Sequence, residues 1–202
     1  MSEKFDSKLP TIGILIFEGF LTNEVVAPMD VFTKKDPTGK TLFNVALIAK
    51  EEKIYRSEEG LRVLPDYTIR NSPGLTVLVV PSSNNPDNQV RDIALINFIK
   101  KQNDTTEYIA SHCAGAFMLG ESGVADKKEI VTYPSGSTKL QTDYPDLLVM
   151  DDNKISVAKD GKFITSNGNL VSYLASLDLL EQMTSKEHRE SVENELLINK
   201  LK

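Results

Sequence analysis

The chain has 202 residues, of which 40% are hydrophobic and 26% are charged, and its formal net charge is −6. This length can bury a sizeable core, so we expect residues 1–202 to form a single domain. Basic residues never occur more than two in a row. Nucleic acid binding needs clustered cations, which argues against nucleic acid as a partner.

The distribution of cysteine and apolar residues favours a cytoplasmic protein. One cysteine excludes an internal disulfide, as is usual in a reducing compartment. The start, MSEKFDSKLP, has no apolar core of the kind that a signal peptide needs. No apolar run approaches the roughly 20 residues that span a bilayer, so no membrane partner is expected. Two histidines and one cysteine show no metal-ligand spacing, and we expect no metal or other cofactor.

Apolar runs alternate with amphipathic segments, which is typical of an α/β sandwich with a mainly parallel sheet. Residues 12–17 (IGILIF) are apolar throughout and predict a strand covered on both faces. A helix is expected over residues 23–34, in which Pro28 marks either a kink or the first turn. Residues 43–49 predict a second strand.

The middle of the chain continues this alternation. Residues 75–80 (LTVLVV) predict a core strand, and the following helix covers residues 90–101. A third core strand is expected over residues 108–111, and it leads through Cys113 into a helix. We expect the core strands at 12–17, 75–80 and 108–111 to be parallel neighbours.

The last third predicts a short strand over 130–132, a hairpin and two helices. The hairpin strands are residues 155–158 and 163–166, joined by a turn centred on Asp160-Gly161. The helix over 170–183 has its leucines on one face, and the segment starting at Thr184 has capping-box form and opens a polar helix. The leucines of that face are Leu170, Leu174, Leu177 and Leu180. The predicted fold is a three-layer α/β/α sandwich with a mainly parallel, flavodoxin-like sheet and a small β-hairpin.

Cys113 is the only thiol, and it lies at a junction between a strand and a helix. At the carboxyl edge of a parallel sheet, a thiol next to the N-terminus of a helix has its pKa lowered and becomes nucleophilic. The small residues at 114–116 let the chain turn tightly there. A buried cysteine that packs as a small hydrophobe is the alternative, and the residues alone leave both interpretations open.

Five ordered segments together resemble the ThiJ/PfpI family of the class I glutamine-amidotransferase-like superfamily. They read IGILIFEGFLTNEVVAPMDVF, LTVLVVP, IASHCAGAFMLGESGVADKKEIVTYP, DYPDLLV and GKFITSNGNLVSYLASLDLLEQM. The pattern is most similar to the branch with isocyanide hydratases and the sensor-like domains of some transcription activators. The resemblance implies that Cys113 is a nucleophile and that the acidic Glu24 contacts its sulfur. It also implies a homodimer that pairs near the first helix.

The chain departs from the family pattern at several positions. Where members often have two glycines, whose amide helps to form an oxyanion site, this chain has Ser82 and Ser83. Isocyanide hydratases carry a threonine immediately after the cysteine, and here that residue is Ala114. His112 precedes the cysteine, where peptidase-like members have a histidine after it, and in an extended strand it faces away from the sulfur. Tyr133 stands where other members have a histidine, so no Cys–His pair is predicted.

Other roles remain open for several of these residues. Glu24 could be a solvated acid in the first turn of a helix, which the helix dipole favours. His112 could be a structural residue hydrogen-bonded behind the site, and Tyr133 could pack or line the pocket. Asn167 lies in a Ser-Asn-Gly-Asn stretch that could be a simple turn with a cap, although the resemblance implies that it is near the pocket.

The leading hypothesis is a cysteine-dependent hydrolase or hydratase of a small molecule, of the amide or isocyanide type. Cys113 attacks, Glu24 manages the proton, and the amides of Ala114 and Ser83 stabilise developing negative charge. The rival hypothesis is a non-catalytic redox or ligand-sensing protein in which Cys113 is oxidised or lines a pocket. A glutaminase module is a third hypothesis, which the missing histidine and acidic triad partners weaken.

Overall fold

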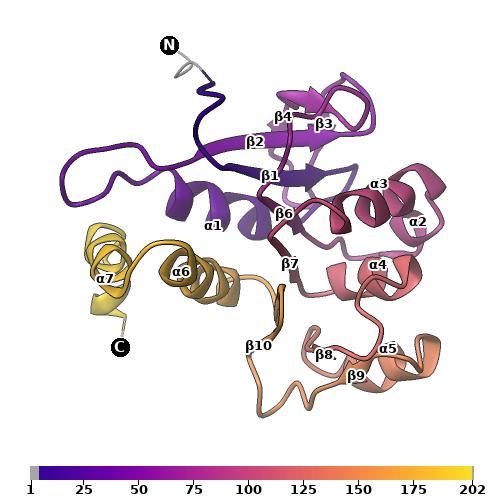
Figure 1. Ribbon diagram of the computed structural model, residues 1–202. Coiled ribbons are helices and arrows are strands. Elements are labelled where there is room, and N and C mark those ends of the chain that lie inside the picture. Colours follow the sequence, from indigo (N-terminus) through magenta and orange to yellow (C-terminus); the bar gives the residue numbers. More distant parts are fainter. Residues whose placement is uncertain (1–4, 202) are drawn as a thin grey trace.

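The computed structural model describes residues 5–201, in which one seven-stranded sheet separates two groups of helices (Figure 1). The strands lie in the order β10-β11-β7-β6-β1-β2-β5. All neighbours are parallel except β10 and β11. The strands are β1 (Thr11–Ile16), β2 (Asn44–Ala49), β5 (Tyr67–Thr68), β6 (Val77–Val80), β7 (Tyr108–His112), β10 (Val157–Asp160) and β11 (Phe163–Ser166).

The three predicted core strands are confirmed as parallel neighbours at the centre of the sheet. β6 pairs with β1 on one side and with β7 on the other. Every residue of β1 and β6 is buried, because helices cover both faces of the sheet. A strand of this kind has no solvent side, which explains why its sequence is apolar throughout. The three-layer fold is therefore as the sequence predicts.

The helices form the two outer layers of the sandwich. Figure 1 shows α1, α6 and α7 on one side of the sheet, and α2, α3 and α4 on the other. α1 packs on α6, and α3 packs on α4. The helices are α1 (Thr22–Phe32), α2 (Asp87–Val90), α3 (Ile93–Asn103), α4 (Gly115–Ser122), α5 (Ser137–Asp143), α6 (Val171–Met183), α7 (Lys186–Glu195) and the short 3₁₀ helix η1 (Ile198–Lys200).

Two small sheets lie outside the main one, and the sequence predicted neither. One is antiparallel and contains β3 (Tyr55–Arg56) and β4 (Arg62–Val63). The other is parallel and contains β8 (Glu129–Ile130) and β9 (Leu148–Val149). The predicted strand at 130–132 is therefore β8, which pairs away from the main sheet. Strands of two residues have too little periodicity to be recognised in a sequence.

Two local predictions are wrong in detail. The hairpin turn is Gly161-Lys162, one residue later than predicted, because Asp160 still pairs with Phe163. Gly161 supplies the positive φ of that turn, +61°. α7 is capped by Ser185, whose hydroxyl accepts from the backbone N–H of His188, and not by the residue before it. Each shift is one residue, which is the usual uncertainty of element ends.

α6 buries only two of the four leucines on the predicted face. Leu177 and Leu180 are fully buried, but Leu170 is 70% exposed and Leu174 is 39% exposed. The other buried residues of α6 include small ones such as Ser172. Small side chains let two helices approach closely, so the leucines at the start of α6 lie on its outer side.

α1 runs through Pro28 without ending there. Glu24 lies in its first turn, and the helix continues to Phe32. Pro28 has no N–H to donate to the carbonyl of Glu24, four residues earlier, so one bond of the helix is missing at this point. Of the two predicted places for Pro28, a kink or the first turn, the first turn is wrong, because α1 already begins at Thr22. None of the helices in residues 5–201 has the length and apolarity needed to cross a membrane.

Candidate active site

Cys113 lies at a sharp turn between β7 and α4. Its φ is +53°, a left-handed conformation that is rare outside glycine. The backbone is held on both sides, since the Cys113 N–H donates to the Ser166 carbonyl at 2.9 Å and the Thr132 hydroxyl donates to the Cys113 carbonyl at 2.9 Å. This geometry turns the thiol out of the strand at the carboxyl edge of the sheet, where open α/β folds place their ligands.

A glycine makes the turn possible. A Cβ added at Gly115 would overlap the carbonyl oxygen of Val80, the last residue of β6, and would press on that of Pro81. The absence of a side chain lets the first turn of α4 lie directly on the end of the neighbouring strand. The prediction that small residues let the chain turn tightly after Cys113 is thus confirmed for Gly115.

Glu24 is completely buried beside Cys113. One carboxyl oxygen, Oε2, accepts from the Ser82 N–H at 2.6 Å, and the other, Oε1, accepts from the Asn169 N–H at 3.2 Å. Its side chain also interacts with the thiol of Cys113. Burial raises the pKa of Glu24, although these hydrogen bonds oppose the rise. The alternative of a solvated first-turn acid is wrong, because the residue has no exposed surface.

The loop between β11 and α6 closes over this pair. Gly168 has a φ of +87°, and a Cβ there would overlap the Cβ of Cys113 and Oε1 of Glu24. The next residue, Asn169, also has a positive φ, +48°, and supplies the N–H that binds Glu24. Sequence reasoning missed both residues as parts of the site. The signals were the turn-forming sequence Ser-Asn-Gly-Asn and the resemblance, which places this stretch near the pocket; neither says which side chains the turn contacts.

The thiol is harder to ionise than the sequence suggested. Burial raises the pKa of Cys113 to about 11, and the Glu24 carboxylate beside it acts in the same direction. The Ser82 hydroxyl and the Ala114 N–H oppose the rise. The predicted lowering by the helix start is therefore present, but burial outweighs it. Since burial raises the pKa of both groups, the pair resists a second negative charge, and the Cys113 thiolate forms most readily when Glu24 holds a proton.

The two serines after β6 have different roles. The Ser82 N–H is occupied by Glu24, so it is not free for a substrate, and the Ser82 hydroxyl is buried without a full hydrogen bond to any described residue. The Ser83 hydroxyl donates to Oε1 of Gln89 at 2.9 Å. No described residue accepts from the Ser83 N–H. Of the two residues, Ser83 is therefore the one that can offer an amide to a ligand.

His112 does not assist the thiol. Its Nδ1 is hydrogen-bonded to the Ser166 hydroxyl at 2.8 Å, and its Nε2 has no partner among residues 5–201. Complete burial lowers the pKa of His112 to about 3, so the ring stays neutral. The structure thus agrees with a structural histidine behind the site.

Tyr133 and Asn167 act at a distance from the sulfur. Tyr133 stacks on Phe117, with ring centroids 6.2 Å apart, which favours packing over the pocket role. Asn167 is buried and donates from Nδ2 to the Thr132 carbonyl at 2.6 Å. Because the Thr132 hydroxyl in turn binds the Cys113 backbone, Asn167 is a positioning residue. Within residues 5–201 there is no group of three acidic, histidine or cysteine side chains placed to hold a metal ion.

Comparison with known proteins places this geometry in a family. The model of the DJ-1/PfpI family matches residues 10–182, which include every site residue described above. The chain belongs to the DJ-1/PfpI family. Among curated relatives, this DJ-1/PfpI chain is 30% identical to protein dj-1beta of Drosophila melanogaster over 146 residues, 71% of the chain and 75% of that protein.

Two further relatives extend the likeness of this DJ-1/PfpI chain. It is 25% identical to the isonitrile hydratase of Pseudomonas putida over 185 residues, which cover 92% of the chain and 77% of that protein. The crystal structure of a ThiJ/PfpI family protein from Pseudomonas syringae superimposes with a TM-score of 0.81 at 20% identity, over 92% of this chain and 73% of the other. At that identity the second likeness concerns the fold alone.

Proposed function

We propose that the chain is a cysteine-dependent hydrolase or hydratase of a small molecule, of the isocyanide or amide type. The observation that carries the proposal is the contact between Cys113, held at a left-handed turn, and the fully buried Glu24. A strained backbone is maintained only where the surrounding structure fixes it, and such positions cluster at active sites. The family relationship to an isonitrile hydratase supports this reaction class.

The residues suit the hydration of an isocyanide. The thiolate of Cys113 attacks the terminal carbon of R–NC, and that carbon takes a proton from the Glu24 carboxyl, which gives a thioimidate, R–N=CH–S. Water then adds to this carbon while Glu24 accepts a proton. The C–S bond breaks as the remaining hydroxyl proton passes to the nitrogen, and an N-substituted formamide leaves with the Cys113 thiolate and the Glu24 carboxyl restored. Glu24 thus holds the proton in the resting state and returns it at each step.

The same residues could support an amide substrate. In that reaction the carbonyl oxygen becomes an anion when Cys113 attacks, and the N–H groups of Ala114 and Ser83 are the donors available to it. An isocyanide carbon develops no such oxyanion in the first step. A neutral, narrow isocyanide also suits a thiol that is partly buried. We therefore favour the isocyanide over the amide.

A substrate panel tests this proposal. Purified protein is incubated with isocyanides, amides and α-oxoaldehydes, and product is measured for the wild type, Cys113→Ala and Glu24→Gln. We expect formamide products from isocyanides, none from Cys113→Ala, and a slower reaction with Glu24→Gln. Turnover that persists unchanged in Cys113→Ala would remove the cysteine mechanism.

One observation favours the redox sensor as the second candidate. The Ser82 hydroxyl is buried near the sulfur with no full hydrogen bond, and the Glu24 carboxyl lies on the same sulfur. Both could donate to an oxygen atom added to Cys113. Reversible oxidation by dilute peroxide, together with no turnover on the panel, would support this function over the enzyme.

We also propose a homodimer that forms beside the site. Leu170 and Leu174 are exposed on the outer side of α6, which packs against α1. Apolar side chains grouped at a surface often mark an interface. Sedimentation should report twice the chain mass of 22.4 kDa at micromolar concentration, and Leu170→Glu should shift it toward the monomer. A monomeric wild type would contradict this proposal.

A further inference from the structure

A cavity, called the second cavity below to keep it apart from the candidate active site, lies at the opposite end of the sheet from Cys113. Its volume is about 510 Å³, and Pro10 and Phe43 line it just before the starts of β1 and β2. Cys113 follows the end of β7, which is parallel to those strands, so a strand length of roughly 15–20 Å separates the two places. The cavity is therefore distinct from the candidate active site, and its volume suits a small organic ligand.

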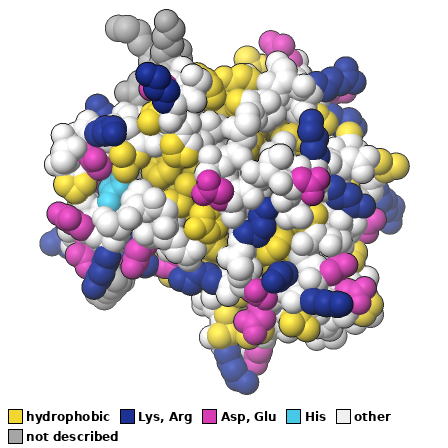
Figure 2. All heavy atoms as spheres, viewed as in Figure 1, with side chains coloured by type: hydrophobic (Ala, Val, Ile, Leu, Met, Phe, Trp, Pro, Cys, Tyr) yellow, Lys and Arg dark blue, Asp and Glu magenta, His cyan; other side chains and the backbone are white. Residues whose placement is uncertain are grey.

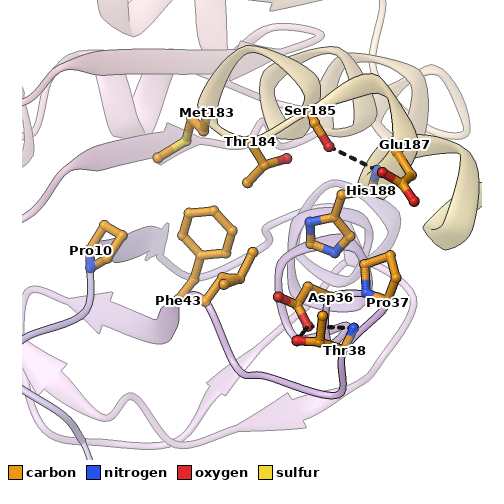
Figure 3. Close-up of a pocket in the computed structure, with 11 residues that line it drawn as sticks. Pro10, Asp36, Pro37, Thr38, Phe43, Met183, Thr184, Ser185, Glu187 and His188 are labelled. Atoms are coloured by element: carbon orange, nitrogen blue, oxygen red, sulfur yellow. Dashed lines mark hydrogen bonds between the residues drawn. The ribbon is translucent and has the colours of Figure 1, made fainter.

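One wall of the cavity is the start of α7, and the facing wall is the loop that leads to β2. Figure 3 shows the His188 ring and the Asp36 side chain facing the same space, with the Phe43 ring at its floor. Figure 2 shows hydrophobic side chains together on this side of the molecule, with acidic and basic ones around them. Leu42 and Met183 complete the apolar lining.

His188 is the observation that points to a ligand. The residue is only 3% exposed, yet neither ring nitrogen has a full hydrogen bond to any described residue. Buried polar groups in folded proteins are normally hydrogen-bonded, and an exception calls for an explanation. Burial lowers the pKa of His188, although the Asp36 charge and the Lys35 carbonyl oppose this, so the ring is neutral and one nitrogen can accept a hydrogen bond.

Asp36 supplies negative charge at the same place. Its Oδ1 accepts from the Thr38 hydroxyl at 2.6 Å, from the Thr38 N–H at 2.9 Å and from the Lys40 N–H at 2.9 Å. These bonds lower the pKa of Asp36 and keep it ionised. No described residue donates a hydrogen bond to Oδ2, so this oxygen remains available. Among the described residues that line the cavity there is no lysine or arginine, whereas Glu187 is a second acid.

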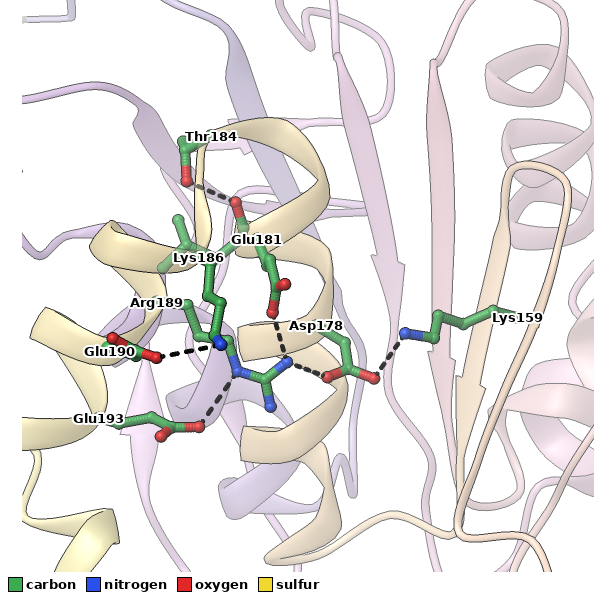
Figure 4. A network of polar contacts seen from close by, with 9 residues as sticks. Lys159, Asp178, Glu181, Thr184, Lys186, Arg189, Glu190 and Glu193 are labelled. Carbon is green, nitrogen blue, oxygen red and sulfur yellow. Dashed lines mark hydrogen bonds and ion pairs between the residues drawn. The ribbon is translucent and has the colours of Figure 1, made fainter.

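The α7 wall is held in place by a network of ion pairs (Figure 4). Arg189, next to His188 in the sequence, binds Asp178 at 2.6 Å and Glu181 at 2.9 Å, both on α6. Asp178 also pairs with Lys159 on β10 at 2.9 Å. The Arg189 side chain is only 23% exposed, so this network is more rigid than a surface pair. The position of His188 is therefore a fixed feature of the fold.

We propose that this cavity binds a small organic ammonium ion with an apolar body. Hydrogen-bond acceptors and negative charge dominate its polar wall, so the ligand must bring donors and a positive charge. Phe43, Met183 and the prolines accommodate the apolar part, and an aromatic ring is favoured there. The ammonium group donates to Oδ2 of Asp36 and to the free nitrogen of His188.

The chain carries its own reporters for this proposal, because its two histidines mark the two sites. His188 lines the second cavity, and His112 lies behind Cys113. Two-dimensional NMR of the histidine rings, on protein freed of any affinity tag, therefore distinguishes them. The probe is 2-phenylethylamine, with the neutral 2-phenylethanol and the anionic phenylacetate as matched compounds.

We expect the amine to shift the His188 signals to saturation while the His112 signals stay in place. Asp36→Asn keeps Oδ1 and the loop bonds, and it should weaken the amine at least about tenfold, because a charged hydrogen bond is lost. The control Asp126→Asn removes one negative charge from an exposed residue away from the cavity and should bind normally. Cys113→Ser should also bind normally.

Several results would overturn the proposal. These are the absence of any His188 shift with the amine, equal affinity for amine and alcohol, and shifts of His112 in place of His188. The comparison of the three compounds uses the wild type alone, so it decides the matter even if Asp36→Asn proves unstable. Unchanged affinity in a folded Asp36→Asn would also contradict the assignment.

Discussion

Replacing Gly168 by alanine tests the geometry of the candidate site with a single methyl group. The residue has a φ of +87°, and its new Cβ would overlap atoms of both Cys113 and Glu24. A left-handed conformation costs an L-residue about 1–2 kcal/mol, and overpacking of a filled interior adds about 1–3 kcal/mol. We therefore expect Gly168→Ala to lower the free energy of unfolding by about 2–5 kcal/mol.

Gly39 offers a matched control. Its φ is +85°, but a Cβ there would have nothing within 4 Å. Gly39→Ala therefore has the same backbone cost as Gly168→Ala and the same effect on the unfolded chain, but its new methyl group overlaps no other atom. Urea unfolding should give a difference between the variants of about 1–3 kcal/mol, and only Gly168→Ala should change the rate at which iodoacetamide modifies the single thiol. Equal stability and equal thiol rates would refute the packing of Gly168 against the pair.

Three further predictions concern the acid, the buried histidine and the ion-pair network. Glu24→Gln keeps a donor beside the sulfur and Glu24→Leu does not, so thiolate absorbance should give a lower Cys113 pKa in the former; equal values would contradict donation from position 24. Burial lowers the pKa of His112 from 6.5 to about 3. Between these two pH values the unfolded chain binds a proton at His112 and the folded chain does not. The free energy of unfolding should therefore be unaffected by His112 above pH 6.5 and fall by about 1.4 kcal/mol per pH unit below it. Urea titrations should show this slope in the difference between the free energies of unfolding of the wild type and His112→Asn. The raised pKa of Glu24 changes the pH dependence in the opposite direction, but it does so in both proteins and cancels in the difference. Arg189→Gln should cost about 2 kcal/mol and open α7 to hydrogen exchange, whereas the exposed Lys186→Gln should cost less than about 0.5 kcal/mol.

The central sheet could be predicted because its strands obey one simple rule. Strands such as β1 and β6 are buried on both faces, so a run of apolar residues marks each of them. The face of α6 could not be predicted in this way. Its leucines at 170 and 174 look like a core stripe but are exposed. Nothing in the local pattern shows which part of a helix its neighbours will cover.

The sequence predicted the two reactive residues of the candidate site, but it did not predict the loop contacts that bury them. Cys113 and Glu24 follow from a junction and a family pattern, and the structure brings both together. The N–H of Asn169 reaches Glu24 across 145 residues of sequence, and Ser82 reaches it across 58. Contacts of that range depend on the fold as a whole. The same reason explains why the thiol pKa was predicted in the wrong direction, since burial of Cys113 is a property of the closed loop and not of the helix start.

The account rests on Cys113 as a nucleophile, and intact-protein mass spectrometry tests this most directly. Glu24→Gln is mixed with an excess of an isocyanide, quenched, and compared with the double variant that also carries Cys113→Ala. Slow loss of the thioimidate should let an adduct accumulate that adds the full mass of the isocyanide, and fragmentation should place it on Cys113. An adduct on another residue, or formamide production at the wild-type rate by Cys113→Ala, would contradict the account.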